Sequence, residues 1–202
     1  LVSGASVEVL NSTNTTFTFT ETSEGEYTTT NFEPQLNETY TLIVEVDNRR
    51  FEATEQLIPV SPIDSIQQRN DGGFSGEDIE LKTFYKDPEN IENFYLFTFD
   101  VPFSAFPEFD IFDDDFNDGN NNFAFYSDED LEPGNEVEIT AHGISRTYFN
   151  YLDILLGQIG SSGGPFQTQP AVVRGNINDV NNPSDFIFGY FSYDLKNDLE
   201  QL

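Results

Sequence analysis

The sequence predicts an all-β protein with one helix, and three observations lead to this prediction. Apolar and polar residues alternate in many short runs, as in half-buried strands. Turn signals such as Asp47-Asn48 and Asp87-Pro88 separate these runs at close spacing, which is typical of antiparallel sandwiches. One stretch near 146–159 has the three- and four-residue apolar spacing of a helix, and Ser145 can cap it.

The first predicted domain covers residues 1–62 and consists of short strands. Residues 5–9 alternate strictly between small apolar and polar side chains, and 40–46 is the strongest strand pattern in this part. Asp47-Asn48 is expected to form a tight turn into a further strand at 50–54. These strands favour an antiparallel sandwich.

The second predicted domain covers residues 63–202. It follows Pro59 and Pro62, which break the strand pattern. Residues 79–85 and 93–99 are expected to form strands. No stretch of the sequence approaches the roughly 18–20 apolar residues of a membrane-spanning helix.

Acidic residues dominate the charge of the chain. Asp and Glu number 37 against 8 Lys and Arg, which gives a formal net charge of −29. Such a charge repels phosphate backbones and anionic membrane surfaces, so binding to nucleic acid or directly to lipid is excluded. It suits cationic partners or metal ions, or it serves only to keep an exported protein soluble. Because the sequence has no cysteine, disulfides and thiolate metal sites are excluded as well.

No group of residues indicates catalysis. His142 is the only histidine, and a catalytic histidine works within a constellation of partners. Residues 160–164 match the G-x-S-x-G pattern of hydrolases, but a predicted helix precedes the serine where that motif needs a strand. Carboxylates are numerous and no pair stands out, which leaves a glycan-active protein as an alternative. We therefore expect no enzyme, and neither catalytic nor cofactor-binding residues.

The long stretch 102–122 is expected to be irregular, and its acidic part suggests calcium. Loops of this length are usually functional or disordered. The predicted ligands are Asp113, Asp115, Asn117 and Asp118, since calcium takes carboxylate and carbonyl oxygens from flexible loops. The spacing is not that of an EF-hand, because Gly119 falls one position late and Ala124 stands where the glutamate belongs. The alternative is a solvated acidic loop without a metal.

A series of short segments along nearly the whole chain carries a family resemblance. They are Gly4-Ala5-Ser6-Val7, Gly25-Glu26-Tyr27, Tyr40-Thr41-Leu42, 59–65, Asp87-Pro88, Asn93-Phe94-Tyr95, 131–137, 148–152, Gly164-Pro165-Phe166, Gly175-Asn176-Ile177 and 188–191. In order and spacing they resemble the Bacteroidetes lipoproteins that carry the domain of unknown function DUF4249. These proteins are often found beside SusC-like TonB-dependent transporters.

The resemblance implies an N-terminal immunoglobulin-like sandwich of the carboxypeptidase-regulatory kind, followed by a larger β-rich domain with one helix. It also implies a lipidated cysteine that anchors the protein in the outer membrane, on its periplasmic or cell-surface side. That cysteine and the first strand region are absent from this sequence, so we expect the chain to be N-terminally truncated. The family supplies no catalytic residues.

These expectations lead to a non-enzymatic accessory lipoprotein that docks on an outer-membrane β-barrel such as a TonB-dependent transporter, capping it or assisting substrate capture. The alternatives are a plug that seals an outer-membrane protein-export channel, and a glycan-binding or glycan-active protein. Ser65, in Asp64-Ser65-Ile66, resembles the O-glycosylation sites of exported proteins in these bacteria. The candidate contact residues are aromatic, and each either contacts the partner or is buried in its own domain. They are Phe103, Phe106, Phe109, Phe112 and Phe116.

Overall fold

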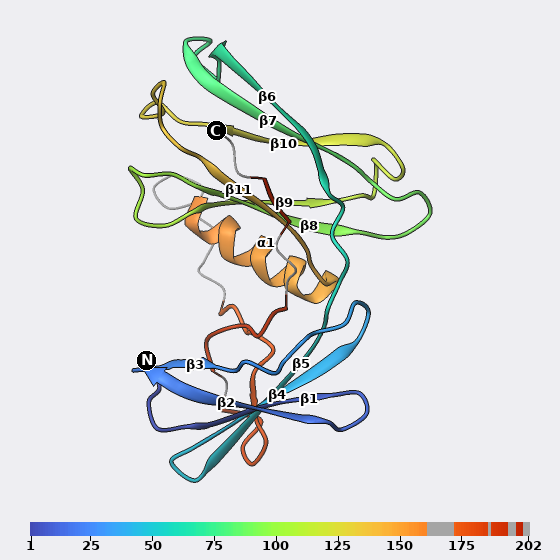
Figure 1. Ribbon diagram of the computed structural model, residues 1–202, viewed down its shortest axis with the longest axis vertical. Coiled ribbons are helices and arrows are strands. Elements are labelled where there is room, and N and C mark those ends of the chain that lie inside the picture. Colours follow the sequence, from blue (N-terminus) through green and yellow to red (C-terminus); the bar gives the residue numbers. More distant parts are fainter. Residues whose placement is uncertain (161–171, 186, 194–196, 200–202) are drawn as a thin grey trace. The chain divides into compact units, whose positions relative to one another are not determined.

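A computed structural model describes residues 1–160, 172–185, 187–193 and 197–199 of the 202-residue chain. The chain divides into two compact units (Figure 1). The first comprises Leu1–Ile58 and Asn150–Tyr193, and the second comprises Pro59–Phe149 and Asp194–Leu202. Strands dominate both units, and one helix is present in the described part of the chain. The predicted fold class, all-β with one helix, is confirmed.

The first unit is built on a six-stranded antiparallel sheet. Its order is β12-β5-β4-β1-β2-β3. The strands are β1 (Ser6–Asn11), β2 (Thr16–Ser23), β3 (Glu26–Thr28), β4 (Thr39–Val46), β5 (Arg49–Gln56) and β12 (Asn178–Asp179). The alternation expected in residues 5–9 is present, since Val7 and Val9 are buried while Ser6 is exposed. Asp47 and Asn48 both have positive φ, 50° and 59°, as a two-residue type I′ hairpin requires.

The first unit is completed by residues from near the end of the chain. Strand β12 pairs with β5, and the buried carboxylate of Asp179 accepts a hydrogen bond from Nε of Arg49 at 2.9 Å. The ring of Tyr193 packs on Tyr40, with centroids 5.0 Å apart. The observed division of the chain therefore differs from the linear one predicted, 1–62 and 63–202, because the first unit takes up a second segment.

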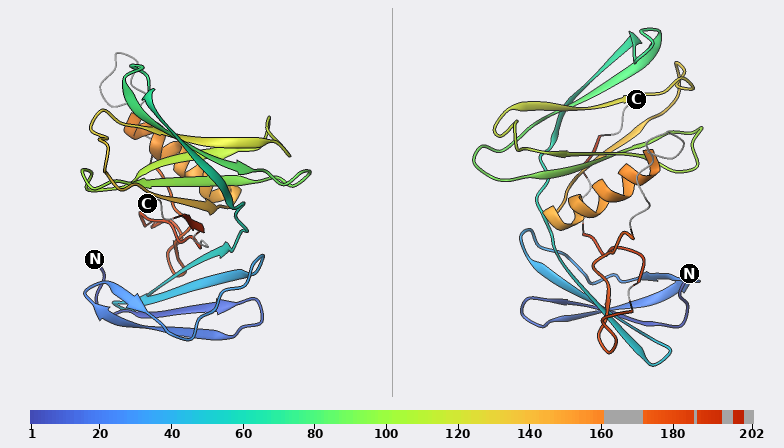
Figure 2. Two further views of the ribbon diagram at one scale, coloured as in Figure 1. Left: turned by 45° about the horizontal axis from the view of Figure 1, so that its top comes forward. Right: turned by 180° about the vertical axis from the view of Figure 1, so that it is seen from behind.

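The second unit is a sandwich of two antiparallel sheets, which lie one over the other (Figures 1 and 2). The three-stranded sheet has the order β10-β7-β6, and the four-stranded sheet has the order β13-β11-β8-β9. The strands are β6 (Ile63–Gly72), β7 (Asp78–Lys86), β8 (Phe94–Asp100), β9 (Glu108–Asp113), β10 (Asn121–Ser127), β11 (Glu138–Gly143) and β13 (Asn197–Leu199). The strands predicted at 79–85 and 93–99 correspond to β7 and β8.

Aromatic side chains fill the space between these two sheets. Tyr85 and Tyr126 of the three-stranded sheet meet Tyr95, Phe97 and Phe99 of β8, and all five are at most 2% exposed. The rings of Tyr85 and Tyr95 lie 4.8 Å apart, and those of Phe99 and Tyr126 are stacked at 5.0 Å. Large aromatic rings bury much area each, so this core forms in a chain whose hydrophobic share is only 37%.

The helix α1 (Arg146–Gly160) begins in the second unit and continues into the segment of the first. Ser145 caps it as predicted, because its Oγ accepts a hydrogen bond from the backbone N–H of Tyr148 at 3.1 Å. The helix predicted near 146–159 is therefore confirmed. Within the part of the chain that the structure describes, no helix has both the length and the apolar character needed to cross a membrane.

The stretch 102–122 is not wholly irregular, and this corrects the expectation. It contains β9, which pairs with β8 along its length, from Phe94↔Asp113 to Phe99↔Glu108. Strand β9 lies at the edge of its sheet. Residues 102–107 and 114–120 form the loops at the two ends of β9, and Asn121 begins β10.

Candidate functional site

The turn between β8 and β9 carries three exposed phenylalanines. Phe103 is 40% exposed, Phe106 is 79% exposed, and Phe109 at the start of β9 is 43% exposed. The turn is fixed locally, since Oγ of Ser104 donates a hydrogen bond to the carbonyl of Phe106 at 2.7 Å. Phe103 and Phe106 in the turn and Phe109 in β9 all lie near the end of one hairpin, and these three residues are called here the phenylalanine tip. Solvent-facing apolar groups of this kind often mark interaction sites.

The other two predicted contact residues lie elsewhere. Phe112 is half-buried, because it lies opposite Tyr95 on the core face of the sheet and packs edge-on against Phe97 with centroids 5.9 Å apart. It therefore belongs to the core of its own unit. Phe116 is 93% exposed but lies in the loop after β9, at the opposite end of that strand from the phenylalanine tip.

The acidic loop after β9 brings carboxylates together, although in a different set from the one predicted. Asp114 and Asp118 of this loop meet Asp87, which follows β7, and each offers an oxygen within 4.8 Å of the others. We call this group the aspartate cluster. Of the predicted ligands only Asp118 is a member. Asp113 accepts a hydrogen bond from the backbone N–H of Asp115, while Asp115 and Asn117 are exposed.

Backbone and tyrosine donors hold the aspartate cluster in place. Asp87 is 0% exposed, and its two oxygens accept hydrogen bonds from the Tyr95 hydroxyl at 2.6 Å and the Gly119 N–H at 2.9 Å. Asp114 is 5% exposed and accepts one from the N–H of Asn93 at 2.8 Å. Gly119 adopts a φ of +71°, a conformation natural to glycine, which allows its N–H to reach Asp87.

Asp118 is the exposed member of the cluster, and the three carboxylates affect one another. Asp118 is exposed and accepts a hydrogen bond from the N–H of Asn90 at 2.8 Å. Burial raises the pKa of the Asp114 carboxyl, and the carboxylates of Asp87 and Asp118 raise this pKa further. The negative charges of the three carboxylates therefore repel one another.

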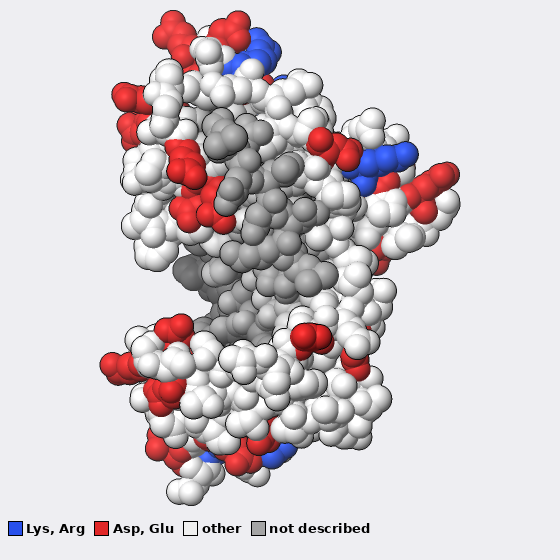
Figure 3. Space-filling view, in the orientation of Figure 1, with Lys and Arg blue, Asp and Glu red and all other residues white. Residues whose placement is uncertain are grey.

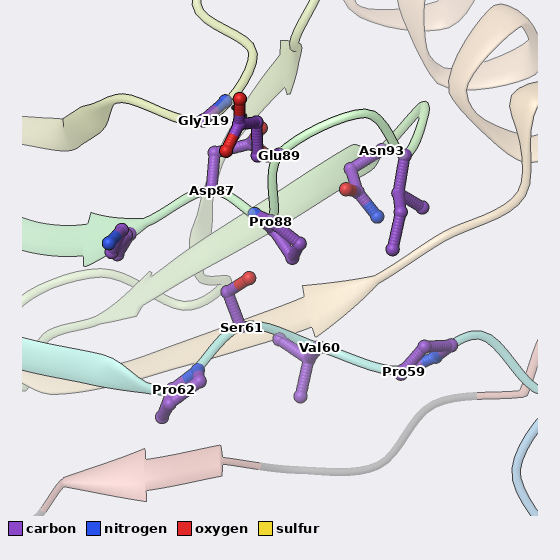
Figure 4. Close-up of a pocket in the computed structure, with 11 residues that line it drawn as sticks. Pro59, Val60, Ser61, Pro62, Asp87, Pro88, Glu89, Asn93 and Gly119 are labelled. Carbon is purple, nitrogen blue, oxygen red and sulfur yellow. Dashed lines mark hydrogen bonds between the residues drawn. The ribbon is translucent and has the colours of Figure 1, made fainter.

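A pocket of about 470 Å³ borders the cluster (Figure 4). Asp87, Asn93 and Gly119 form part of its wall, together with Pro59 and Ser61 from the segment before β6. The hydroxyl of Ser61 lies 3.2 Å from the Tyr95 hydroxyl, which connects this segment to Asp87. The pocket is thus lined both by polar groups and by the rings of Pro59, Pro62 and Pro88.

One further carboxyl lies against the core. Asp110 of β9 is directly opposite Phe97, which is 0% exposed, so its side chain points toward the core face of the sheet. Desolvation raises the pKa of this carboxyl to about 6, and the nearby Glu108 adds to the rise. Sequence alternation alone did not single out this residue.

The remaining predicted positions are placed as follows. Ser65 is exposed on β6, next to a register irregularity in its pairing with β7, and its modification stays a prediction. His142 is buried in β11. Residues 161–164 of the G-x-S-x-G match, and the Gly164-Pro165-Phe166 segment of the family resemblance, lie outside the described residues.

On the face shown in Figure 3, most of the charged side chains are acidic. Asp and Glu side chains are spread over the face shown, and Lys and Arg are few. Several of the arginines are already paired with carboxylates, as Arg50 is with Glu45 and Glu52. The net charge of −29 is thus largely presented to solvent or to partners.

Comparison with known proteins identifies the family. The model of the domain of unknown function DUF4249 matches residues 1–194. No curated protein matches the chain. A solved structure, the two-fibronectin-type-III-domain segment from chicken tenascin, is similar at 11% sequence identity, with 72% of this chain and 78% of that chain covered. Its TM-score is 0.30, too low to support an argument about this protein. The family match spans nearly all of the sequence, and the chain belongs to the DUF4249 family.

Proposed function

We propose that this protein is a non-enzymatic accessory lipoprotein of the cell envelope that docks on an outer-membrane β-barrel, such as a TonB-dependent transporter. In this role it caps the barrel or assists substrate capture. The observation that carries the proposal is the phenylalanine tip, with Phe106 79% exposed between Phe103 and Phe109. Aromatic anchors of this kind supply much of the binding energy in protein interfaces.

The position of the tip favours contact with a protein. It ends a hairpin whose outer strand, β9, is an edge strand with backbone groups available for pairing. Two exposed acidic residues flank it, Asp100 at the end of β8 and Glu108 at the start of β9. An apolar centre with a charged rim is the usual arrangement of a protein interface, and this rim suits a cationic partner surface.

The kind of partner and the location rest on family membership. The DUF4249 match supports the resemblance to lipoproteins found beside SusC-like transporters, from which we propose an outer-membrane location and an upstream lipid anchor.

The test is a mild-detergent pull-down of the full-length native protein, with co-purifying proteins identified by mass spectrometry. The wild type is compared with Phe106→Ser, and Phe74→Ser is the control, since Phe74 is 101% exposed in the turn between β6 and β7. We expect a stoichiometric barrel protein with the wild type and the control, and its loss or strong reduction with Phe106→Ser. Both substitutions remove an exposed ring, so neither should disturb folding.

The identity of the recovered protein distinguishes the roles. A TonB-dependent transporter supports the cap, whereas an export channel instead supports a plug. If no barrel protein is recovered with the wild type, docking is refuted. Equal recovery with Phe106→Ser and wild type refutes the role of the phenylalanine tip.

A further inference from the structure

We propose that the aspartate cluster, together with the side-chain oxygen of Asn93, is a calcium-binding site. Its ligands are one or more carboxylate oxygens from each of Asp87, Asp114 and Asp118, and Oδ1 of Asn93. Water molecules from the adjoining pocket complete the coordination. These are the hard oxygen ligands that calcium takes, in numbers of about six to eight.

The first argument is the unsatisfied oxygen of Asn93. This residue is 7% exposed, and its Oδ1 is buried without a hydrogen-bond partner in the part of the chain that the structure describes. Its own backbone N–H donates to Asp114, so the residue is held against the cluster. In Figure 4 the side-chain oxygen of Asn93 lies on the side that faces Asp87 and Pro88. A buried acceptor left without a partner costs about 1–3 kcal/mol, and a cation would satisfy it.

The second argument is uncompensated charge. Asp87 and Asp114 are buried beside each other, and among the described residues none of the recorded ion pairs with lysine or arginine includes either of them. The hydrogen bonds to each carboxylate oxygen come from single neutral donors, which leaves lone pairs free. Buried carboxylates that lack a cationic partner are usually protonated or bound to a metal. Two of them, Asp87 and Asp114, converge here with the exposed carboxylate of Asp118.

The third argument is size. The cluster oxygens lie within 4.8 Å of one another. Ligands on opposite sides of a calcium ion are about 4.6–5.2 Å apart, twice the usual calcium–oxygen distance, whereas those of magnesium are about 4.0–4.2 Å apart. Separations of up to 4.8 Å are compatible with ligands around a calcium ion, and we expect weaker binding of magnesium because magnesium requires a near-ideal octahedral geometry.

The site joins segments from both sheets of the second unit. Asp87 follows β7 of one sheet, Asn93 precedes β8 of the other, and Asp114 and Asp118 follow β9. A bound ion would fasten these chain segments together at the end of the sandwich. Binding to the folded state alone would raise the unfolding temperature in proportion to the logarithm of the calcium concentration.

The test is isothermal titration of the metal-free protein with calcium chloride, and separately with magnesium chloride. We expect one saturable site with a dissociation constant below about 1 mM, as in extracellular calcium modules. Magnesium should bind at least about 10-fold more weakly, because it requires shorter bonds and a near-ideal octahedron. Thermal unfolding with and without calcium gives a second readout.

Matched variants locate the site. Asp118→Asn removes one exposed ligand charge, and Asp115→Asn removes the same charge from an exposed neighbour outside the cluster. We expect about 10-fold weaker calcium binding in the first variant and less than about a 2-fold change in the second. Absence of saturable binding by the wild type at about 10 mM calcium would overturn the proposal. Equal weakening in both variants would also overturn it, because it would indicate diffuse attraction to an acidic surface.

Discussion

Replacing Asp110 by asparagine should stabilise the protein at neutral pH. The Asp110 carboxyl faces the core opposite Phe97, and burial raises its pKa from 3.8 to about 6. A difference of about 2 corresponds to about 3 kcal/mol at 1.36 kcal/mol per pH unit. Because the side chain is only half-buried, solvent screening reduces this to about 1 kcal/mol. For a chain of this size, that is a rise of about 2–4 °C in the unfolding temperature.

The pH dependence gives the sign of the effect. The folded protein binds the Asp110 proton more tightly than the unfolded chain, so this group contributes stability below about pH 4 that is lost as pH rises through about 6. Asp110→Asn should therefore match the wild type near pH 4 and exceed it above pH 6. Thermal unfolding followed by circular dichroism across this range measures the difference. Asp100→Asn, an exposed change of the same charge at the end of β8, is the control.

Two outcomes would show that this reasoning is wrong. One is a difference between Asp110→Asn and the wild type that stays constant from pH 4 to pH 8. The other is an equal gain from Asp100→Asn, which would trace the effect to the net charge of −29 instead of to burial.

Two tyrosine substitutions should each weaken one unit. Tyr95→Phe removes the hydroxyl that donates to Asp87 at 2.6 Å and leaves a buried carboxylate oxygen without its donor, so we expect the second unit to lose about 2 kcal/mol of unfolding free energy. Tyr85→Phe, in the same core, is the control. Tyr40→Phe removes the acceptor of the Gln35 N–H at 2.8 Å and should cost the first unit about 1 kcal/mol. Urea unfolding measures all three, and an equal effect of Tyr85→Phe and Tyr95→Phe would contradict the role of the hydrogen bond.

Local features of the fold could be predicted from the sequence. The helix follows from Ser145 and the spacing of its apolar residues, both of which lie within one short segment. The tight turn at Asp47-Asn48 follows from two residues that tolerate positive φ. In each case the residues that determine the structure are neighbours in the chain.

Sequence patterns do not predict the features of the fold that depend on residues far apart in the chain. The sequence predicts a loop where β9 lies, because Pro102, Pro107 and the aspartates that follow are atypical of a strand. The stability of this six-residue strand comes from pairing with β8. The pairing of β12 with β5 in the first unit has no periodic signal in the sequence, since β12 is only two residues long. Tertiary pairing determines both features.

The candidate metal ligands illustrate the same limit. The acidic stretch 113–118 indicated calcium, and Asp118 lies in the cluster. Taking alternate residues of this stretch as ligands selects Asp113 and Asp115. In the structure β9 ends at Asp113, and the following turn directs the side chain of Asp114 inward. The sequence pattern around Asp87 indicates only a turn, and that around Asn93 only the start of a strand. Nothing in their local sequence indicates that both meet Asp114.

The phenylalanine tip and the proposed calcium site lie at opposite ends of the β8–β9 hairpin, so each can be tested without altering the other. Strand β9 runs from the phenylalanine tip to Asp113, six residues or about 20 Å. Substitution of Phe106 at one end leaves every proposed calcium ligand in place, and substitution of Asp118 at the other end leaves the three exposed rings in place. A protein that binds calcium yet recovers no barrel would refute docking alone. One that recovers its barrel without binding calcium would refute the metal site alone, because a contact made by exposed rings requires no ion.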